Sequence, residues 1–252
     1  MISDTELLKK RFIELARKSD NSGYFTFTDF LGLAEQSAFA EIKKELRGIK
    51  YEAFGGAEGA ERVVIRFGSE DELGYSVPYP ISIVKVEPQS QRFAEKLTHR
   101  DFLGAILNLG IERDTLGDIV IIDNVGYIFA LESIAPYIVE NLVRVRHTDM
   151  HTEIIDELPE GDLFRTESKT VQAVGERLDA IVAKVFNLSR DDAQSLFKKR
   201  LVFASGREIE STSYIPKENE VISVRGHGRF IYRGCASFSK KGKMNIKVDV
   251  YV

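Results

Sequence analysis

Positively charged side chains gather in one short stretch of the chain, LSRDDAQSLFKKRLVFASG, at residues 188–206. The whole chain has a net charge of −4, yet four cations fall within eleven residues here: Arg190, Lys198, Lys199 and Arg200. Convergent Lys and Arg side chains suit the phosphates of a polyanion, because each neutralised phosphate releases counterions. An ordinary solvated helix face is the alternative explanation.

The charge of the chain is unevenly distributed. Residues 1–170 hold 20 Lys and Arg against 30 Asp and Glu, a net charge of −10, whereas residues 171–252 hold 15 against 9, a net charge of +6. A basic last third on an acidic body indicates a polyanion partner for that third alone. A charge pattern that only keeps the surface soluble would look similar.

A short helix is predicted to carry the cations of this stretch. Ser189 is a suitable N-cap for a helix that begins at Arg190, and Asp192 completes a capping box. Successive residues of a helix turn by 100°, so cations spaced by four lie on one stripe. That stripe, next to an apolar one, is formed by Arg190, Gln194 and Lys198.

A preceding helix is predicted over residues 175–186. Arg177 and Lys184 share the side opposite to its apolar residues. If the two helices pack by their apolar faces, Arg177, Lys184, Arg190 and Lys198 lie on one outer surface. Such a surface suits a phosphate backbone.

The remainder of the chain predicts a mixed α and β protein. Helices are expected over 5–18 and 29–47, followed by a strand at 62–67. Residues 81–155 show the order β-α-β-β-α-β of the ferredoxin-like split unit, without the aromatic signature of the common RNA-recognition module. A polar stretch at 158–170 is expected to be a linker.

Four spaced blocks of the last third resemble the S4 RNA-binding domain, over about residues 171–232. They are Glu176 to Asp179, Ser189 to Ala193, Val202 to Gly206, and Glu220 to Gly226. Two positions depart from the pattern of that family. Arg200 stands where a helix-ending glycine is usual, and Ser205 stands where an asparagine is usual.

The whole chain resembles the YlmH-type S4-domain proteins, through its helical start, the block LTHRDFLGAILNLGIERDTLGDIVI and the S4-like end. The resemblance implies an α+β fold with a helix-rich domain at 1–75, a ferredoxin-like, RNA-recognition-like domain at 76–157, a linker at 158–170 and an S4 domain with a C-terminal hairpin at 171–252. It implies a non-catalytic protein that binds ribosomal RNA or tRNA on the large ribosomal subunit, in translation rescue or quality control.

The second hairpin of the S4-like part, VRGHGRF, adds two arginines beside glycines, which let a backbone approach RNA closely. Ser189 is expected to cap its helix and to donate a hydrogen bond, and His227 is either a contact or only part of the turn. The expected RNA-binding residues are Arg177, Lys184, Ser189, Arg190, Gln194, Lys198, Lys199, Arg200, Arg225, Gly226, His227 and Arg229.

Two other functions stay open. The Arg-Leu-Asp of residues 177–179 also occurs in RNA-modifying pseudouridine synthases, although the usual run after the catalytic aspartate is missing. The acidic first 170 residues could instead dock a protein partner, as in an adaptor linked to cell division.

No cofactor or metal is expected. His147 and His151 are four residues apart, but no third ligand is evident, and Cys235 is the single cysteine. The start of the chain lacks the apolar region of a signal peptide, and no apolar run approaches the roughly 20 residues of a membrane span, so a cytosolic protein is expected.

Overall fold

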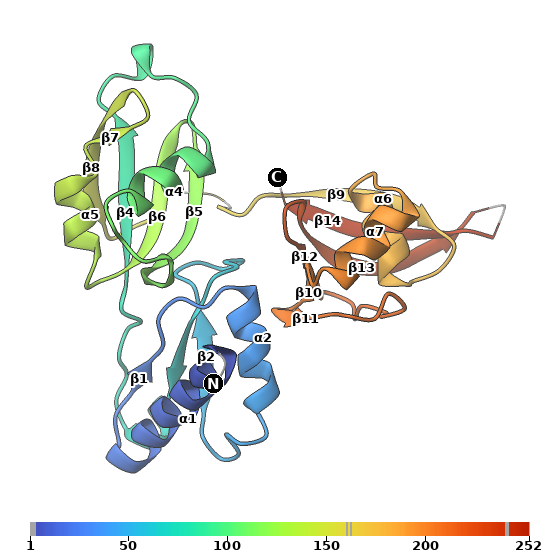
Figure 1. Cartoon of the computed structure of the whole chain (residues 1–252), viewed down its shortest axis with the longest axis horizontal. Coiled ribbons are helices and arrows are strands. Elements are labelled where there is room, and N and C mark those ends of the chain that lie inside the picture. Colours follow the sequence, from blue (N-terminus) through green and yellow to red (C-terminus); the bar gives the residue numbers. More distant parts are fainter. Residues whose placement is uncertain (1–3, 160, 162, 240–241, 252) are drawn as a thin grey trace. The chain divides into compact units, whose positions relative to one another are not determined.

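The computed structural model describes residues 4–159, 161, 163–239 and 242–251. The chain divides into two compact units, a first unit Met1–Leu163 and a second unit Phe164–Val252 (Figure 1). The first unit contains two antiparallel sheets, each with its own apolar core, and the second unit contains one sheet and one core. None of the helices in the described ranges is long and apolar enough to cross a membrane.

The first unit begins with a three-stranded antiparallel sheet of order β1-β3-β2, against which two helices pack. Three buried aromatic rings form the centre of its core: the Phe12 and Phe39 ring centroids lie 5.4 Å apart, and those of Phe39 and Phe67 lie 6.1 Å apart. The elements are α1 (Asp4–Ser22), β1 (Thr26–Phe27), α2 (Leu33–Ile42), β2 (Tyr51–Phe54), β3 (Val64–Phe67) and α3 (Glu70–Leu73).

This part is less helical than expected. The helix predicted over 29–47 is present only as α2, because the residues before it bind to the sheet in an extended form. Leu31 forms an isolated bridge with Val63, and the Oγ1 of Thr28 accepts a 2.9 Å hydrogen bond from the backbone N–H of Ile65. The backbone groups there are satisfied by strand partners rather than by a helical turn.

The rest of the first unit is a five-stranded antiparallel sheet of order β5-β6-β4-β8-β7, with α4 and α5 packed on one face (Figure 1). Val84 and Ile128 of the two central strands are fully buried against Phe102 of α4 and Ile138 of α5. The elements are β4 (Ile81–Pro88), α4 (His99–Leu107), β5 (Leu116–Ile122), β6 (Val125–Leu131), α5 (Ala135–Asn141), β7 (Arg144–Val145) and β8 (Thr148–Ile155), with short 3₁₀ turns at Gln91–Phe93 and Arg113–Thr115.

The start of α4 is fixed by side-chain hydrogen bonds at its N-cap, Thr98. The Oδ2 of Asp101 accepts hydrogen bonds from the backbone N–H and the Oγ1 of Thr98, at 2.8 and 2.7 Å, which completes a capping box. These bonds lower the pKa of Asp101. The helical pattern of residues 132–146 predicts a longer helix than α5, which ends at Asn141 because Arg144 and Val145 pair with β8.

Arg62 joins the two parts of the first unit. Its guanidinium donates to three backbone carbonyls: Nε to Leu116 at 2.8 Å, and Nη2 to Phe30 at 2.9 Å and to Arg113 at 3.1 Å. Burial lowers the pKa of Arg62. One side chain thus ties the segment before α2 to the start of β5.

The second unit is a six-stranded antiparallel sheet of order β11-β10-β12-β13-β14-β9, with two helices on one face (Figure 1). Its core contains Leu178 and Ile181 of the first helix, Phe197 of the second, and Phe230 and Ile246 of the sheet. The elements are β9 (Thr166–Ala173), α6 (Leu178–Val185), α7 (Arg190–Lys198), β10 (Val202–Ala204), β11 (Arg207–Glu208), β12 (Val221–Val224), β13 (Gly228–Phe238) and β14 (Met244–Tyr251).

The polar stretch expected as a linker over 158–170 is shorter than predicted. Its residues from Thr166 onward belong to β9, which pairs with β14 from Thr166↔Tyr251 to Ala173↔Met244. β9 lies at the edge of the sheet and hydrogen-bonds to β14 alone. Its polar side chains are mostly exposed, as is common for edge strands. The hairpin predicted at the end of the chain is confirmed as β13 and β14, and Lys240 and Lys241 of its turn lie outside the described residues.

Candidate nucleic-acid interface

The start of α6 is organised around a buried carboxylate. The side chain of Asp179 is 2% exposed and accepts two hydrogen bonds from Arg177, Nε to Oδ1 at 3.1 Å and Nη2 to Oδ2 at 2.9 Å. The backbone N–H of Ala180 donates a third hydrogen bond at 2.9 Å. Arg177 keeps 46% of its side chain exposed, so the pair fixes its guanidinium while leaving one side open to solvent.

The same carboxylate connects α6 to α7. Gln194 donates from Nε2 to the Oδ2 of Asp179 at 3.2 Å. Burial alone would raise the pKa of Asp179, but the hydrogen bonds from Arg177 and Gln194 and the charge of Arg177 outweigh it and lower the pKa. Arg177 and Gln194, both predicted RNA contacts, are therefore brought together, and Asp179 is what holds them.

The predicted cap of α7 is confirmed. The Oγ of Ser189 accepts a 3.1 Å hydrogen bond from the backbone N–H of Asp192. The same hydroxyl donates to the Oδ2 of Asp192 at 2.6 Å. The proton of this hydroxyl is thus used at the start of the helix, where Ser189 positions α7, and its predicted hydrogen bond to RNA stays a prediction.

The predicted stripe of α7 faces solvent. Ala193, Leu196 and Phe197 are buried in the core, while Arg190 and Lys198 are exposed. Lys184, in the last turn of α6, and Lys199, which follows α7, are exposed as well. Because Gln194 lies midway along the stripe and reaches Asp179, the stripe runs beside the start of α6.

The two residues that depart from the S4 pattern, Arg200 and Ser205, both have a positive φ. Arg200 has a φ of 58°, in the left-handed region that favours glycine. Ser205 and Gly206 have φ of 47° and 77°, the signs of a type I′ hairpin turn, for which Asn-Gly is the preferred pair. Arg200 forms ion pairs with Glu208 at 3.3 Å and with Glu210 at 3.1 Å.

The turn between β12 and β13 lies next to the ends of both helices. The backbone N–H of Arg225 donates to Leu201, which follows α7, at 2.9 Å. The ring of His227 lies 5.8 Å from that of Phe186, the residue after α6. Gly226 has a φ of 83°, so its place in the turn requires a glycine-like backbone.

The sheet register separates two predicted contacts from the others. Phe203 pairs with Ser223, and Ser223 pairs with Arg229, so these three side chains share one face of the sheet. Their chain neighbours on β10, β12 and β13 are core residues beneath α6 and α7. Arg229 therefore lies on the face opposite to the helices, and Arg225, whose guanidinium carbon is 5.3 Å from the Phe203 ring centroid, lies there too.

Comparisons with known proteins agree with the resemblance. Residues 76–157 match the family model described as "Putative RNA-binding domain in YlmH". The chain is 28% identical over 230 residues to the ribosome-associated protein quality control protein P2 of Bacillus subtilis (strain 168), covering 88% of this chain and 86% of that protein. It is homologous to YlmH-type proteins. The solved structure of the cell division protein ylmH from Streptococcus pneumoniae aligns with a TM-score of 0.46 and 22% identity, over 60% of this chain and 91% of that one.

The part matched by the family model has a groove lined by arginines. A depression of about 540 Å³ lies between α4 and the segment from α5 to β7. Arg144 pairs with Asp149 at 3.1 Å, and Arg146 lies 3.5 Å from a carboxylate oxygen of Glu95. The groove is lined by Arg100, Arg144, Arg146, Asn108 and Asn141, and also by Asp101, whose Oδ1 lies 3.7 Å from the Nη1 of Arg146.

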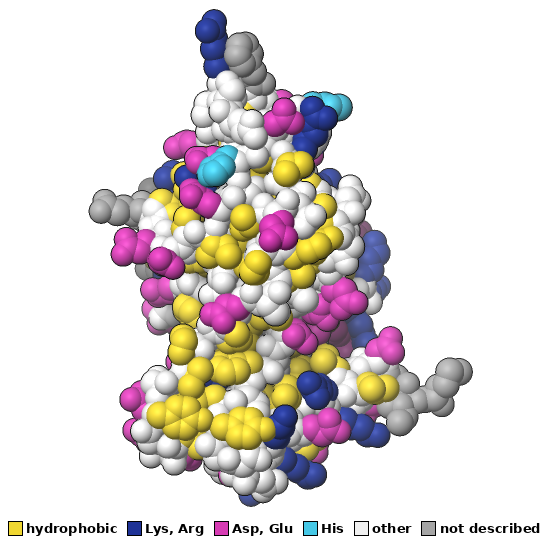
Figure 2. Space-filling model, turned by 90° about the vertical axis from the view of Figure 1, so that its left-hand side faces the viewer, with side chains coloured by type: hydrophobic (Ala, Val, Ile, Leu, Met, Phe, Trp, Pro, Cys, Tyr) yellow, Lys and Arg dark blue, Asp and Glu magenta, His cyan; other side chains and the backbone are white. Residues whose placement is uncertain are grey.

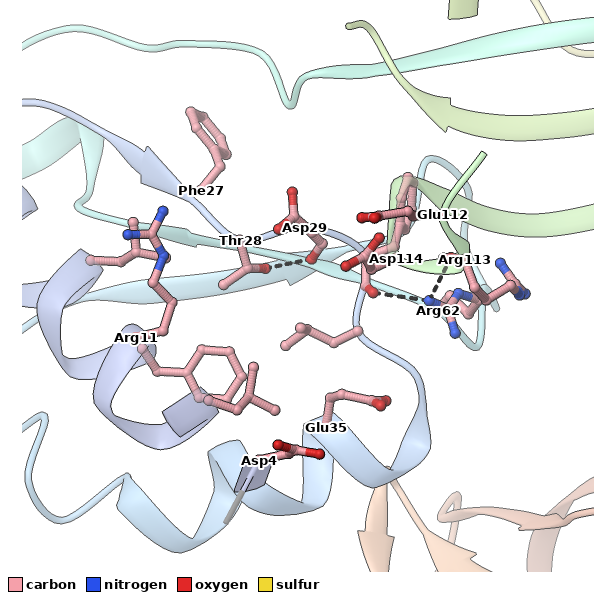
Figure 3. Close-up of a pocket in the computed structure, with 15 residues that line it drawn as sticks. Asp4, Arg11, Phe27, Thr28, Asp29, Glu35, Arg62, Glu112, Arg113 and Asp114 are labelled. Atoms are coloured by element: carbon pink, nitrogen blue, oxygen red, sulfur yellow. Dashed lines mark hydrogen bonds between the residues drawn. The ribbon is translucent and has the colours of Figure 1, made fainter. Parts of the chain in front are cut away.

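A second depression of about 550 Å³ lies beside α1 and the start of α2, and Figure 3 shows carboxylates and arginines around it. Burial raises the pKa of Asp29, and the nearby charge of Asp114 raises it further. Arg62 also lines this depression, and its guanidinium donates hydrogen bonds to the backbone carbonyls of Leu116 and Phe30. Burial, together with the neighbouring charge of Arg62, lowers the pKa of Arg113 to about 10.

His151, which was considered together with His147 as a metal ligand, lies beside two glutamates. His151 lies on β8 near Glu87 and Glu153, and one ligand atom from each lies within 4.8 Å of the others. The Nζ of Lys85 bonds to Glu87 at 2.9 Å and to Glu153 at 3.2 Å, so a lysine already supplies positive charge to both carboxylates.

Figure 2 shows one face of the molecule, on which Asp and Glu side chains are dispersed rather than gathered in one patch.

Sequence reasoning missed the role of Asp179. It treated the Arg177–Asp179 block as a family signature and as a possible catalytic motif, but not as the link between the two helices. The signal was present, because an aspartate on the apolar side of a helix is buried only when it is paired. The face on which Arg225 and Arg229 lie could be found only from the strand register.

Proposed function

We propose that this chain is a non-catalytic RNA-binding protein that acts on the ribosome. The observation that carries the proposal is the set of exposed cations on and beside α6 and α7, next to the hydrogen-bond network that joins Arg177 and Gln194 through Asp179. These cations are Arg177, Lys184, Arg190, Lys198 and Lys199. Cations held in place on two packed helices suit the phosphates of structured RNA, which proteins read mainly by shape and backbone.

The proposed architecture has three domains. Residues 1–75 form a small α/β domain, and residues 76–157 form a ferredoxin-like domain, supported by the strand order β5-β6-β4-β8 around two helices. The S4 domain begins with β9 at Thr166, because that strand completes its sheet. The helix pair α6 and α7 followed by the β10–β11 hairpin supports the S4 assignment.

The proposed ligands are ribosomal RNA, tRNA or both, on the large ribosomal subunit, in rescue or quality control of interrupted translation. The name of the Bacillus subtilis relative supports a ribosomal setting, and the description of the matched family model supports RNA as ligand. A ribosomal partner would place the protein in the cytosol.

A non-catalytic role is supported by the state of Asp179, the candidate nucleophile of the pseudouridine synthase alternative. Its carboxylate is buried and accepts hydrogen bonds from Arg177, Gln194 and the backbone of Ala180. A carboxylate with its lone pairs so engaged is a poor nucleophile and has no open approach for a base.

Co-sedimentation with purified large ribosomal subunits on a gradient tests the proposal. The wild type should migrate with the subunits at low salt, and Arg190→Glu/Lys198→Glu should remain at the top. The matched control is Lys10→Glu/Lys44→Glu, which reverses two exposed lysines of the first unit and should leave co-migration unchanged. A wild type that stays at the top at every salt concentration contradicts the ribosomal role.

A further inference from the structure

The face of the second unit's sheet that is opposite to α6 and α7 carries positive charge of its own. Strand register places Lys247 and Asp249 of β14 on this face, because Ile246 and Val248 between them belong to the core beneath the helices. Arg229 lies there through its pairing with Ser223, and Arg233 reaches Asp249 with Nε at 2.6 Å from Oδ2.

Among the residues that the structure describes, strand register places more cations than carboxylates on this face. Glu208 lies on it, since it pairs with Phe203, and its carboxylate is 3.3 Å from the Nε of Arg200. Asp249 is bound by Arg233 and by the hydroxyl of Ser168, at 2.6 Å. Among the described residues that strand register places on this face, Arg225 and Lys247 add further positive charge, and Arg229 lies beside them.

Two of these arginines are held by aromatic rings. The guanidinium carbon of Arg229 lies 4.1 Å from the ring centroid of Tyr251 and 4.9 Å from that of Phe164. Arg225 lies over Phe203, which is only 1% exposed. A guanidinium stacked on a ring keeps its N–H groups in its own plane, where they can donate to phosphate oxygens.

We propose that this face, formed by Arg225, Arg229, Arg233 and Lys247, is a second RNA-contact surface that binds a separate RNA segment from the one on the helices. The inference rests on the proposed function, since it assumes that the helix surface binds RNA. The helices and the core lie between the two surfaces, so one straight duplex cannot lie along both. The unit would therefore bridge two RNA segments through their phosphate backbones.

A capture experiment with the full chain tests this inference. One RNA hairpin is biotinylated and immobilised, and the same hairpin with a fluorescent label is added in solution together with the protein. The wild type should capture the labelled hairpin and bind two hairpins per chain in a titration. Sedimentation analysis of the protein alone establishes the number of chains per particle, so that capture through a dimer is recognised and counts against the inference.

Two matched variants assign the surfaces. Arg225→Gln/Lys247→Gln should retain one hairpin per chain and lower capture by about tenfold or more, because two phosphate contacts are lost. Arg190→Gln/Lys198→Gln, with the same net charge, should lower capture while sparing the sheet face. Glutamine keeps a stem over Phe203, and an unchanged circular dichroism spectrum verifies folding.

The outcomes separate the two proposals. If the wild type binds one hairpin per chain and Arg225→Gln/Lys247→Gln binds it with the same affinity, the proposal of a second surface is wrong. The proposal that the helices bind RNA is then unaffected. Absence of any hairpin or ribosome binding by the wild type overturns both. Two hairpins per chain, reduced to one by either variant, supports the bridge.

Discussion

Gln194 on α7 and Asp179 on α6 are joined by a 3.2 Å hydrogen bond, and through it the two helices share one buried carboxylate. Asp179 also binds Arg177, so a single residue fixes both a cation and an amide of the candidate RNA surface. The geometry of that surface therefore depends on a residue that does not itself reach solvent.

Replacing Asp179 should weaken the second unit. Asp179→Asn keeps the shape but loses the charge-assisted bonds to Arg177, and we expect the free energy of unfolding to fall by about 2 kcal/mol. Urea unfolding followed by circular dichroism measures the change. Gln194→Met, which removes one neutral bond, should have a smaller effect, and an equal effect for both variants would contradict the role of the charge.

The stability that Asp179 contributes should depend on pH. Its pKa is lowered in the folded chain from the ordinary value of 3.8, so the contribution is present above that value and is lost as pH falls through the folded pKa. The difference in unfolding free energy between wild type and Asp179→Asn should be constant near neutral pH and should shrink below pH 3.8. A difference in unfolding free energy that grows as the pH falls would contradict a lowered pKa of Asp179 in the folded chain.

Arg200 should be strained by its left-handed backbone. Arg200→Gly and Arg200→Ala both remove the exposed ion pairs with Glu208 and Glu210, but only glycine relieves the φ of 58°. We expect Arg200→Gly to be more stable than Arg200→Ala by about 1 kcal/mol. Equal midpoints of thermal unfolding for the two variants would show that the position carries no strain.

Arg62 should be essential for the first unit. Arg62→Leu leaves the carbonyls of Phe30, Arg113 and Leu116 without this donor, and we expect a loss of about 3 kcal/mol or more. Arg62→Lys should not rescue it, because one ammonium cannot reproduce the planar fork. Arg100→Leu, at an exposed arginine, serves as the control and should change the unfolding free energy by less than about 0.5 kcal/mol.

Much of the helix surface was predictable because its signals are local. The cap at Ser189, the buried stripe of Ala193, Leu196 and Phe197, and the exposed stripe of Arg190 and Lys198 follow from spacing along one helix. The capping box of Thr98 and Asp101 is local in the same way.

The features that could not be predicted depend on distant partners. Leu31 leaves the expected helix because Val63, far along the chain, offers a strand partner. The polar residues of β9 form a strand only because β14 pairs with them. Arg225 and Arg229 were predicted as RNA contacts without a face of the fold, and only the sheet register shows that they lie opposite to the helices.

The measurement that tests the central claim most directly is the salt dependence of RNA binding. Binding of the wild type to a labelled RNA hairpin should weaken steeply as salt rises, and Arg190→Gln/Lys198→Gln should lower the slope of log affinity against log salt by about 2, one unit for each lost phosphate contact. Lys10→Gln/Lys44→Gln, with the same net charge, should keep the wild-type slope. If the two double variants show the same slope, the charge of the helix surface acts only through net charge, and the claim that α6 and α7 bind RNA is contradicted.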